Sequence, residues 1–275
     1  PSIAKATFFA AAAAAVVSVD GALLRSEHED RHATANDDAN YGWSESMNST
    51  MVDFPTDYYG VDVSQPYGES TFKCLKGLNL KYAIIRCYES VGKVDPACAG
   101  SAAAANSAGM DVHAYMFPCP TCGGAAGQVS DLLSYWEEHK VNVKRLWLDI
   151  EGSQYWTSSH ASNQAFYEGL VKACKNEGLK CGVYSSASQW APIFGSTSYS
   201  YGSDLPLWFA DYDGTPSFDG WAKFGGWSKP TLKQFTDAGS KCGCSYDISW
   251  DLTSQSKVLK VQCMWWQRSA VQCSV

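Results

Sequence analysis

The amino-acid sequence predicts an α/β fold, an irregular TIM-like β/α barrel with eight strands and a reduced set of helices. Eight short apolar runs, each bounded by turn residues, recur between residues 59 and 249. Helix-compatible segments separate these runs in the first half, which is typical of βα units and a parallel sheet. The connections after Tyr184 are instead rich in Gly, Ser and aromatic residues, so the second half of the barrel should be poor in helix.

The predicted elements follow one another with short connections. The strands are Tyr59–Val63, Tyr82–Cys87, Val112–Phe117, Arg145–Ile150, Lys180–Tyr184, Leu207–Ala210, Leu232–Phe235 and Ser245–Ser249. The helices are Ser70–Gly77, Cys98–Ala108, Gly124–Glu138 and Asn163–Glu177. In the last helix, Phe166, Leu170 and Cys174 recur at helical spacing before Gly178 ends the pattern, which predicts an apolar face packed on the sheet.

Four segments are expected along the chain. Residues 1–22 are interpreted as part of a signal peptide, because the apolar run Ala6–Val19 has 14 residues. A membrane span needs about 20. Residues 23–57 are acidic and poor in apolar periodicity, as in a disordered linker or propeptide. The barrel domain is expected over 58–252, followed by a C-terminal extension of unknown role over 253–275.

Composition narrows the class of partner. The net charge of −7 and the pI near 5.2 argue against nucleic acid and against attachment to anionic membranes by charge. With 11 Trp, 15 Tyr and 11 Phe, the chain has many rings that could stack on sugars. We expect a monomer without a membrane span.

Eleven cysteines indicate an oxidising compartment, so we expect a secreted protein or one of the lysosomal or phagosomal lumen. Asn48 begins a glycosylation sequon, which agrees with secretion. Cys119 and Cys122 form a C-x-x-C motif, interpreted as a local disulfide or as halves of two separate bridges rather than a zinc site. A thioredoxin-like redox pair is the alternative. The odd count leaves at least one thiol unpaired or bonded between chains.

Carboxylates gather at the ends of the predicted strands, where parallel barrels carry their chemistry. Asp149 and Glu151 are separated by one residue and so share a face of their strand. Asp62 ends the first run, and Asp247 lies in the eighth. Asp211 and Asp213 follow the sixth run. Burial should raise the pKa of at least one of the pair, with Glu151 the better candidate for a proton donor.

The ordered set of short motifs resembles glycoside hydrolase family 25, the Chalaropsis-type lysozymes, and is most similar to secreted lysozymes of nematodes and amoebozoans. The matching segments are Gly60–Gln65, Tyr82–Arg86, Leu146–Gly152, Gly182–Ser186, Pro206–Ala210, Gly226–Pro230 and Tyr246–Ser249. The resemblance implies a modified β/α barrel and cleavage of the β-1,4 bond from N-acetylmuramic acid to N-acetylglucosamine in peptidoglycan, with retention.

The resemblance also implies roles. Glu151 would be the general acid, Asp149 would orient and charge-stabilise the site, and Asp62 and Asp247 would complete the acidic cluster. Whether an enzyme carboxylate or the N-acetyl group of the substrate attacks the anomeric carbon stays open, because it depends on the distance between carboxyl groups.

Aromatic residues near the strand ends are candidates for substrate contact, and packing at the barrel top is the alternative for each. The predicted substrate-binding residues are Tyr184, Trp208, Tyr212, Asp211, Trp227 and Tyr155. Tyr184 and Trp208 rank highest because their segments match the family pattern.

Two other functions compete with the lysozyme. A sugar-binding or immune-recognition protein could use the same barrel with little catalysis, although it would not need four carboxylates. A chitinase would carry D-x-x-D-x-D-x-E, and only the final D-x-E is present. We expect no cofactor and no metal, because His113, His139 and His160 lack ligand spacing and no phosphate-binding loop occurs.

Overall fold

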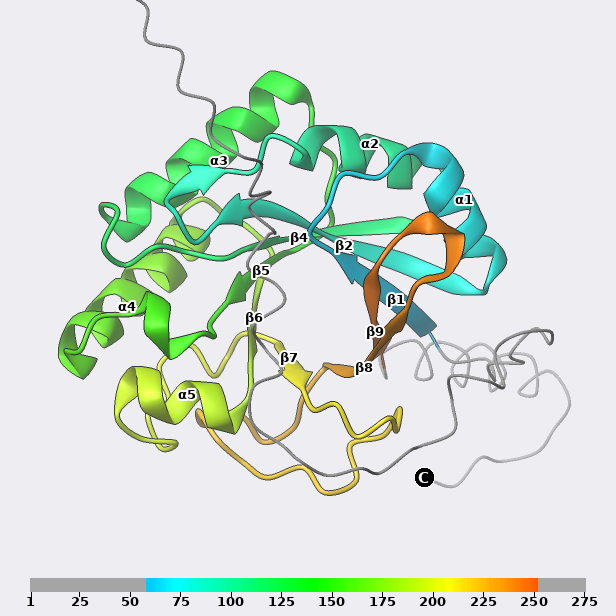
Figure 1. Cartoon of the computed structure of the whole chain (residues 1–275). Coiled ribbons are helices and arrows are strands. Elements are labelled where there is room, and N and C mark those ends of the chain that lie inside the picture. Colours follow the sequence, from blue (N-terminus) through cyan, green and yellow to red (C-terminus); the bar gives the residue numbers. More distant parts are fainter. Residues whose placement is uncertain (1–57, 252–275) are drawn as a thin grey trace, which may run out of the picture. The chain divides into compact units, whose positions relative to one another are not determined.

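The computed structural model describes residues 58–251, and its elements run from Tyr58 to Asp251 (Figure 1). The predicted signal peptide over 1–22, the linker over 23–57 and the extension over 253–275 lie outside the described residues, as does Asn48. Within the described part, no helix combines the length and the apolar character that crossing a bilayer requires.

Eight strands close into a barrel, as the sequence predicted. The ring runs β1, β2, β4, β5, β6, β7, β8, β9 and back to β1, while the short β3 pairs with the end of β2 outside it. The bounds are β1 Tyr58–Val63, β2 Leu80–Glu89, β3 Lys93–Val94, β4 Asp111–Met116, β5 Leu146–Asp149, β6 Cys181–Ser185, β7 Leu207–Ala210, β8 Leu232–Gly239 and β9 Tyr246–Asp251.

The last strand corrects the expectation of a parallel sheet. The pairs from β1 through β8 around the ring are parallel, but β9 is antiparallel to both β8 and β1. A parallel return needs a crossover of a dozen or more residues. Residues 240–245 leave room only for the single 3₁₀ turn η4 (Lys241–Gly243), so the chain returns as a hairpin.

Helices cover the outside of the barrel (Figure 1). The four predicted helices are confirmed as α1 Glu69–Gly77, α2 Cys98–Ser107, α3 Ala125–His139 and α4 His160–Asn176. A fifth, α5 (Ala187–Phe194), was not predicted, because it lies in the Ser- and aromatic-rich stretch after Tyr184 that was expected to be poor in helix. It also contains Pro192, a residue type that usually interrupts a helix. The Ser186 side chain caps α5 by accepting from the Gln189 amide. Beyond α5, the described residues hold only the turn η4, as the helix-poor second half predicted.

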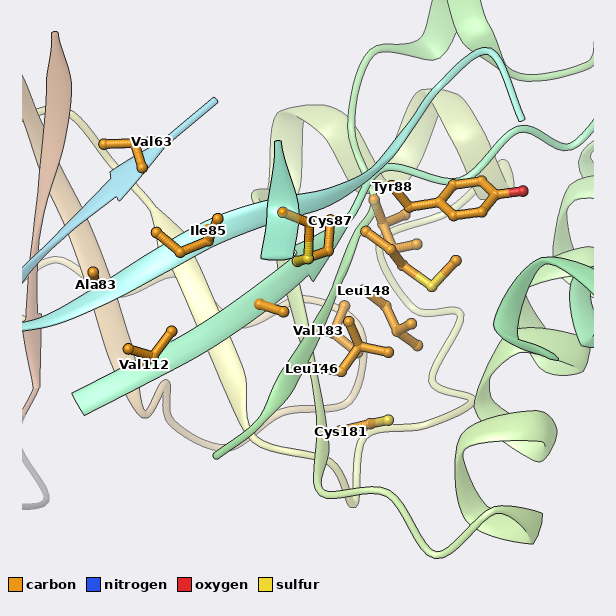
Figure 2. Close-up of a cluster of buried hydrophobic side chains, with 14 of the residues drawn as sticks. Val63, Ala83, Ile85, Cys87, Tyr88, Val112, Leu146, Leu148, Cys181 and Val183 are labelled. Carbon is orange, nitrogen blue, oxygen red and sulfur yellow. A yellow bond between two sulfur atoms is a disulfide. The ribbon is translucent and has the colours of Figure 1, made fainter. Parts of the chain in front are cut away.

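The side chains of each strand alternate between two apolar layers. One layer, between the strands and the helices, includes Val63, Ile85, Val112, Leu148 and Val183, which Figure 2 shows side by side on successive strands. The other fills the barrel interior with Tyr82, Ile84, Tyr115, Trp147, Tyr184, Trp208 and Leu232.

Glycine makes room for the large interior rings. A Cβ atom at Gly60 would lie 2.2 Å from the ring of Tyr82, and one at Gly182 would lie 2.3 Å from the ring of Trp147. Such approaches are far inside van der Waals contact, so any larger residue would displace an interior ring. The barrel is therefore a packed core, and its chemistry has to lie at its rim.

Four disulfides are present in the described residues, in line with the expected cross-linked protein. They are Cys74–Cys242, Cys87–Cys98, Cys119–Cys122 and Cys174–Cys181. The C-x-x-C motif therefore forms the predicted local disulfide. Cys244 is buried with a free thiol, while Cys263 and Cys273 lie outside the described residues.

A half-buried histidine on β4, His113, makes the free energy of unfolding depend on pH. The indole Nε1 of Trp147 donates to His113 Nδ1 at 3.2 Å, which requires a neutral ring. Burial and then the charge of Arg145 lower the pKa of His113 from 6.5 to about 4. Full stability is therefore expected above pH 6.5. As the pH falls from 6.5 toward 4, His113 becomes protonated in the unfolded chain but not in the folded one. The free energy of unfolding therefore falls, by about 2–3 kcal/mol in total.

Urea unfolding of wild type and His113→Gln between pH 4 and 7.5 measures this loss. Glutamine can still accept from Trp147 but does not titrate, so the wild type should lose stability relative to the variant as the pH falls. His139→Gln, at an exposed position in the last turn of α3, is the control. A constant difference between wild type and His113→Gln across this range would contradict the expectation.

Candidate functional site

Four predicted carboxylates lie at one rim of the barrel. Asp62 is the second-last residue of β1, Asp149 ends β5 and Glu151 follows two residues later. Asp247 is the second residue of β9, and because β9 runs antiparallel its beginning meets the ends of the parallel strands. Asp62, Asp149 and Glu151 are buried, whereas Asp247 is half-buried. The four carboxylates therefore belong to the same end of the barrel, Asp247 because of the hairpin.

Asp62 and Asp247 are bridged by an amide that sequence reasoning missed. The two aspartates are direct partners in the β1–β9 register. The Nε2 of Gln234, on β8, donates to Asp62 Oδ1 and Oδ2 at 3.0 and 2.9 Å and to Asp247 Oδ2 at 3.0 Å. Hydrogen bonds to charged acceptors are stronger than neutral ones. The amide therefore offsets part of the repulsion between two neighbouring carboxylates.

Two tyrosine hydroxyls fix the orientation of this amide. Tyr184 and Tyr212 place their hydroxyls 2.6 and 2.7 Å from Gln234 Oε1. The Tyr212 hydroxyl is also 2.9 Å from Asp247 Oδ2, and its single proton can go to either acceptor. With hydroxyl donors on its oxygen and carboxylates on its nitrogen, Gln234 has one favourable orientation.

The chain beyond β5 is held so that Glu151 has a fixed backbone. The Ile150 amide continues the ladder by donating to the Tyr184 carbonyl at 2.9 Å. The Ser185 hydroxyl donates to the Ile150 carbonyl at 2.7 Å, and Trp156 Nε1 donates to the Glu151 carbonyl at 2.9 Å. Because Trp156 and Ser185 are buried, this turn is anchored in the core. Such support is what precise placement of a reacting group requires.

A left-handed glycine follows Glu151 directly. Gly152 has φ +63°, and a Cβ there would lie 2.6 Å from the ring of Tyr155. Its amide donates to Gln189 Oε1 at 2.8 Å, so the unpredicted helix α5 supports the same turn. Glycine is thus required at this position by both its dihedral angle and its neighbour.

The predicted aromatic residues divide into buried and accessible groups. Trp208 lies inside the barrel against Tyr184, with its Nε1 donating to Ser249 Oγ at 2.9 Å. Trp227 is buried in an outer aromatic cluster beside Trp190, with its Nε1 donating to the Leu205 carbonyl at 2.8 Å. Packing explains both tryptophans, so their placement lends no support to the predicted sugar contact.

Tyr184 is also buried, and its hydroxyl serves Gln234 rather than the surface. Tyr155 is half-buried and packs edge-on against Phe117, with ring centres 5.1 Å apart. Tyr212 is 45% exposed. Tyr212 and Tyr155 are therefore the two predicted aromatic residues with ring surface left for a ligand.

Asp211 does not join the acidic cluster through any contact that the structure gives. Its Oδ2 lies 3.4 Å from Lys233 Nζ, on the strand that also carries Gln234. Neither Lys233 nor Gln234 was predicted from the sequence, although both gave the same signal. Lys233 and Gln234 are polar side chains near the start of β8, in a stretch buried on both faces, and such a stretch tolerates them only if each has partners.

The described residues contain no cluster of side chains that resembles a metal site. No group of three or more His, Cys, Asp or Glu residues there is arranged to hold a metal ion. The rim instead offers carboxyl groups, an amide and tyrosine hydroxyls, a set suited to acid-assisted hydrolysis of a polar bond.

Replacing Gln234, whose amide bridges Asp62 and Asp247, should slow catalysis at the acidic cluster. Gln234→Met keeps the length and apolar packing of the side chain but leaves Asp62 and Asp247 facing each other without a shared donor. We expect kcat to fall about 10- to 100-fold, since buried charged hydrogen bonds contribute about 1.5–3 kcal/mol. The measurement is the initial rate of hydrolysis of bacterial cell wall, the substrate that the sequence resemblance implies.

Gln154→Met, at an exposed position on the 3₁₀ turn after Glu151, is the matched control and should keep the wild-type rate. Unchanged turnover in Gln234→Met would show that the amide contributes nothing to catalysis.

Comparisons with known proteins identify this barrel. The family model described as lysozyme-like protein 1 matches residues 54–235. A protein of Dictyostelium discoideum named probable GH family 25 lysozyme 2 is 49% identical to this chain over 192 residues. The match covers 70% of this chain and 89% of that protein. The chain belongs to the glycoside hydrolase family 25 lysozymes.

Other family 25 relatives and their folds agree with this assignment. Lysozyme-like protein 5 of Caenorhabditis elegans is 40% identical over 195 residues, covering 70% of this chain and 90% of that protein. The solved structure of a muramidase from Acremonium alcalophilum superimposes with a TM-score of 0.60 at 20% identity, covering 73% of this chain and 96% of that one. The family 25 barrel is thus shared at low sequence identity.

Proposed function

We propose that this family 25 enzyme hydrolyses the β-1,4 bond between N-acetylmuramic acid and N-acetylglucosamine in bacterial peptidoglycan, with retention at the anomeric carbon. The observation that carries the proposal is the convergence of Asp62, Asp149, Glu151 and Asp247 on one rim, with two of them bridged by Gln234. The structural neighbour from Acremonium alcalophilum is a muramidase, which supports the same substrate class.

The four carboxyl groups take two different roles, which glycoside hydrolysis requires. Glu151 donates its proton to the leaving glycosidic oxygen. Asp149, Asp62 and Asp247 supply fixed negative charge beside the oxocarbenium-like transition state. Because Gln234 and the tyrosine hydroxyls hold the two bridged aspartates in place before substrate arrives, little reorganisation is needed during the reaction.

We further propose that the enzyme works outside the cytosol, in secretions or in a lysosomal or phagosomal lumen. The four disulfides of the described barrel support this location, since reducing compartments do not maintain such bonds. The acidic pI near 5.2 suits an acidic lumen, where repulsion from anionic cell walls is weaker. An activity optimum clearly above pH 7 would contradict the acidic setting.

Product analysis tests the function. Purified peptidoglycan is digested, the new reducing ends are reduced with borohydride, and the sugars are identified after acid hydrolysis. A muramidase yields reduced muramic acid. Reduced glucosamine from peptidoglycan, or release from chitin oligomers alone, would support a different glycosidase. Binding of peptidoglycan without any release would support the sugar-binding alternative.

A further inference from the structure

Lys233 is a fully buried lysine next to the site. Its side chain is 0% exposed, and its Nζ lies 2.6 Å from Asp213 Oδ2 and 3.4 Å from Asp211 Oδ2. Burying a lysine is costly unless its charge is paired. Lys233 precedes Gln234 on β8, so the two side chains point to opposite faces of the strand. Gln234 faces the acidic cluster, and Lys233 faces the segment that follows β7.

That segment, residues 211–215, is fastened to β8 along its length. The Asp211 amide donates to the Gln234 carbonyl at 3.0 Å, and the Gly214 amide donates to the Phe235 carbonyl at 2.9 Å. The Thr215 amide donates to Asp213 Oδ1 at 2.8 Å. Asp213 thus binds Lys233 with one oxygen and closes its own turn with the other.

Tyr212 lies between the two aspartates that hold Lys233. Its hydroxyl reaches Gln234 and Asp247, while the residue as a whole is 45% exposed. Two consecutive residues of β8 therefore hold Tyr212. Lys233 binds the two aspartates on either side of it, and Gln234 binds its hydroxyl. A partly exposed tyrosine held in place beside the acidic cluster is a preformed surface for the apolar face of a sugar.

We propose that Lys233 is a positioning residue for substrate binding, which presents the Tyr212 ring to a sugar unit of the glycan chain through its ion pairs with Asp213 and Asp211. The inference rests on the proposed function. Without the buried charge, the segment keeps its two backbone hydrogen bonds to β8 and the bonds of the Tyr212 hydroxyl but loses both ion pairs, so the substrate would have to complete its ordering. Ordering a loosened segment costs conformational entropy at the moment of binding, so the loss should fall on substrate binding.

Steady-state kinetics on soluble peptidoglycan fragments test the proposal with Lys233→Met, which keeps the length of a buried side chain and removes the charge. The released carboxylates of Asp211 and Asp213 are partly exposed and can be solvated, so the variant should fold. We expect KM to rise about tenfold, the equivalent of about 1.4 kcal/mol, with kcat within twofold of wild type.

The same substitution is then made in a Tyr212→Ala background, where the ring that Lys233 positions is gone. Lys233→Met should there raise KM by less than twofold. Equal effects in both backgrounds, or a fall in kcat with KM unchanged, would overturn the proposal, because a purely structural role does not depend on Tyr212.

Asp213→Asn provides a second variant that leaves the lysine in place and should also raise KM. Asp204→Asn is its matched control, because it removes a surface ion pair of 2.8 Å to Lys175 on α4. If wild type and Asp204→Asn release nothing from peptidoglycan, the proposed function fails. If both are active and neither Lys233→Met nor Asp213→Asn changes KM, the positioning role fails alone.

Discussion

Glu151→Gln is expected to lower kcat for peptidoglycan about 10²- to 10⁴-fold while substrate binding is retained, the range that a positioned general acid contributes. Glutamine has the shape of glutamate but no proton to give to the leaving oxygen. The backbone of residue 151 keeps its bond from Trp156 Nε1, and the Ile150 carbonyl keeps its bond from Ser185, so the turn should not move. The measurement is loss of turbidity of a cell-wall suspension, together with sedimentation of enzyme with intact walls.

The control is Glu138→Gln, at an exposed position near the end of α3, which should clear walls at the wild-type rate. If Glu151→Gln cleared walls at the wild-type rate, Glu151 would not be the proton donor. Weak binding with normal turnover would instead assign Glu151 to substrate recognition.

The strands could be predicted because a barrel strand carries its own signal. Each short run of buried residues bounded by turn residues stood out, and all eight ring strands overlap a predicted run. Direction was harder, because nothing inside Tyr246–Asp251 distinguishes a parallel from an antiparallel strand. The information lay in the connection over 240–245, which is too short for a crossover.

The acidic rim was predictable in part. Asp149 and Glu151 are neighbours in sequence, and strand alternation places both on one face. The bridge from Gln234 to Asp62 joins residues far apart in sequence, and only the closed barrel brings β1, β8 and β9 together. A lone glutamine in an apolar strand signals that it has partners, but not which ones.

The aromatic residues show a different limit. Trp208 is the second residue of β7 and Tyr212 follows the strand by two residues, so their positions in sequence made both candidates for sugar contact. Trp208 faces the closed interior, and Tyr212 lies past the last pair of strand residues, where the chain turns over the rim. Sequence position alone could not separate packing from exposure for these two rings.

Loss of the Cys74–Cys242 disulfide is expected to lower the free energy of unfolding by about 3–5 kcal/mol. The bond joins α1 to the turn η4, and its ends are 168 positions apart in the sequence, so it restricts the unfolded chain strongly. The chain-entropy relation gives about 5 kcal/mol for a loop of this size, and strain in the folded state usually reduces the gain.

The same disulfide anchors the hairpin that brings Asp247 to Asp62. The Ser245 amide adds one hydrogen bond of 3.1 Å to the Tyr67 hydroxyl, which alone should hold the turn less firmly. Both cysteines must be replaced by serine together, because Cys244 has a free thiol two residues from Cys242 and could pair with Cys74 instead. Activity should therefore be lost at a lower temperature than in wild type.

The Cys119→Ser/Cys122→Ser double variant is the matched control for guanidinium unfolding. It also removes one disulfide, but the ends are only three residues apart, and the same relation gives about 2 kcal/mol. The Cys74–Cys242 variant should therefore unfold at a clearly lower denaturant concentration than the control. Equal midpoints would mean that the long-range bond contributes no more than a local one, and that β-sheet pairing alone holds Asp247 opposite Asp62.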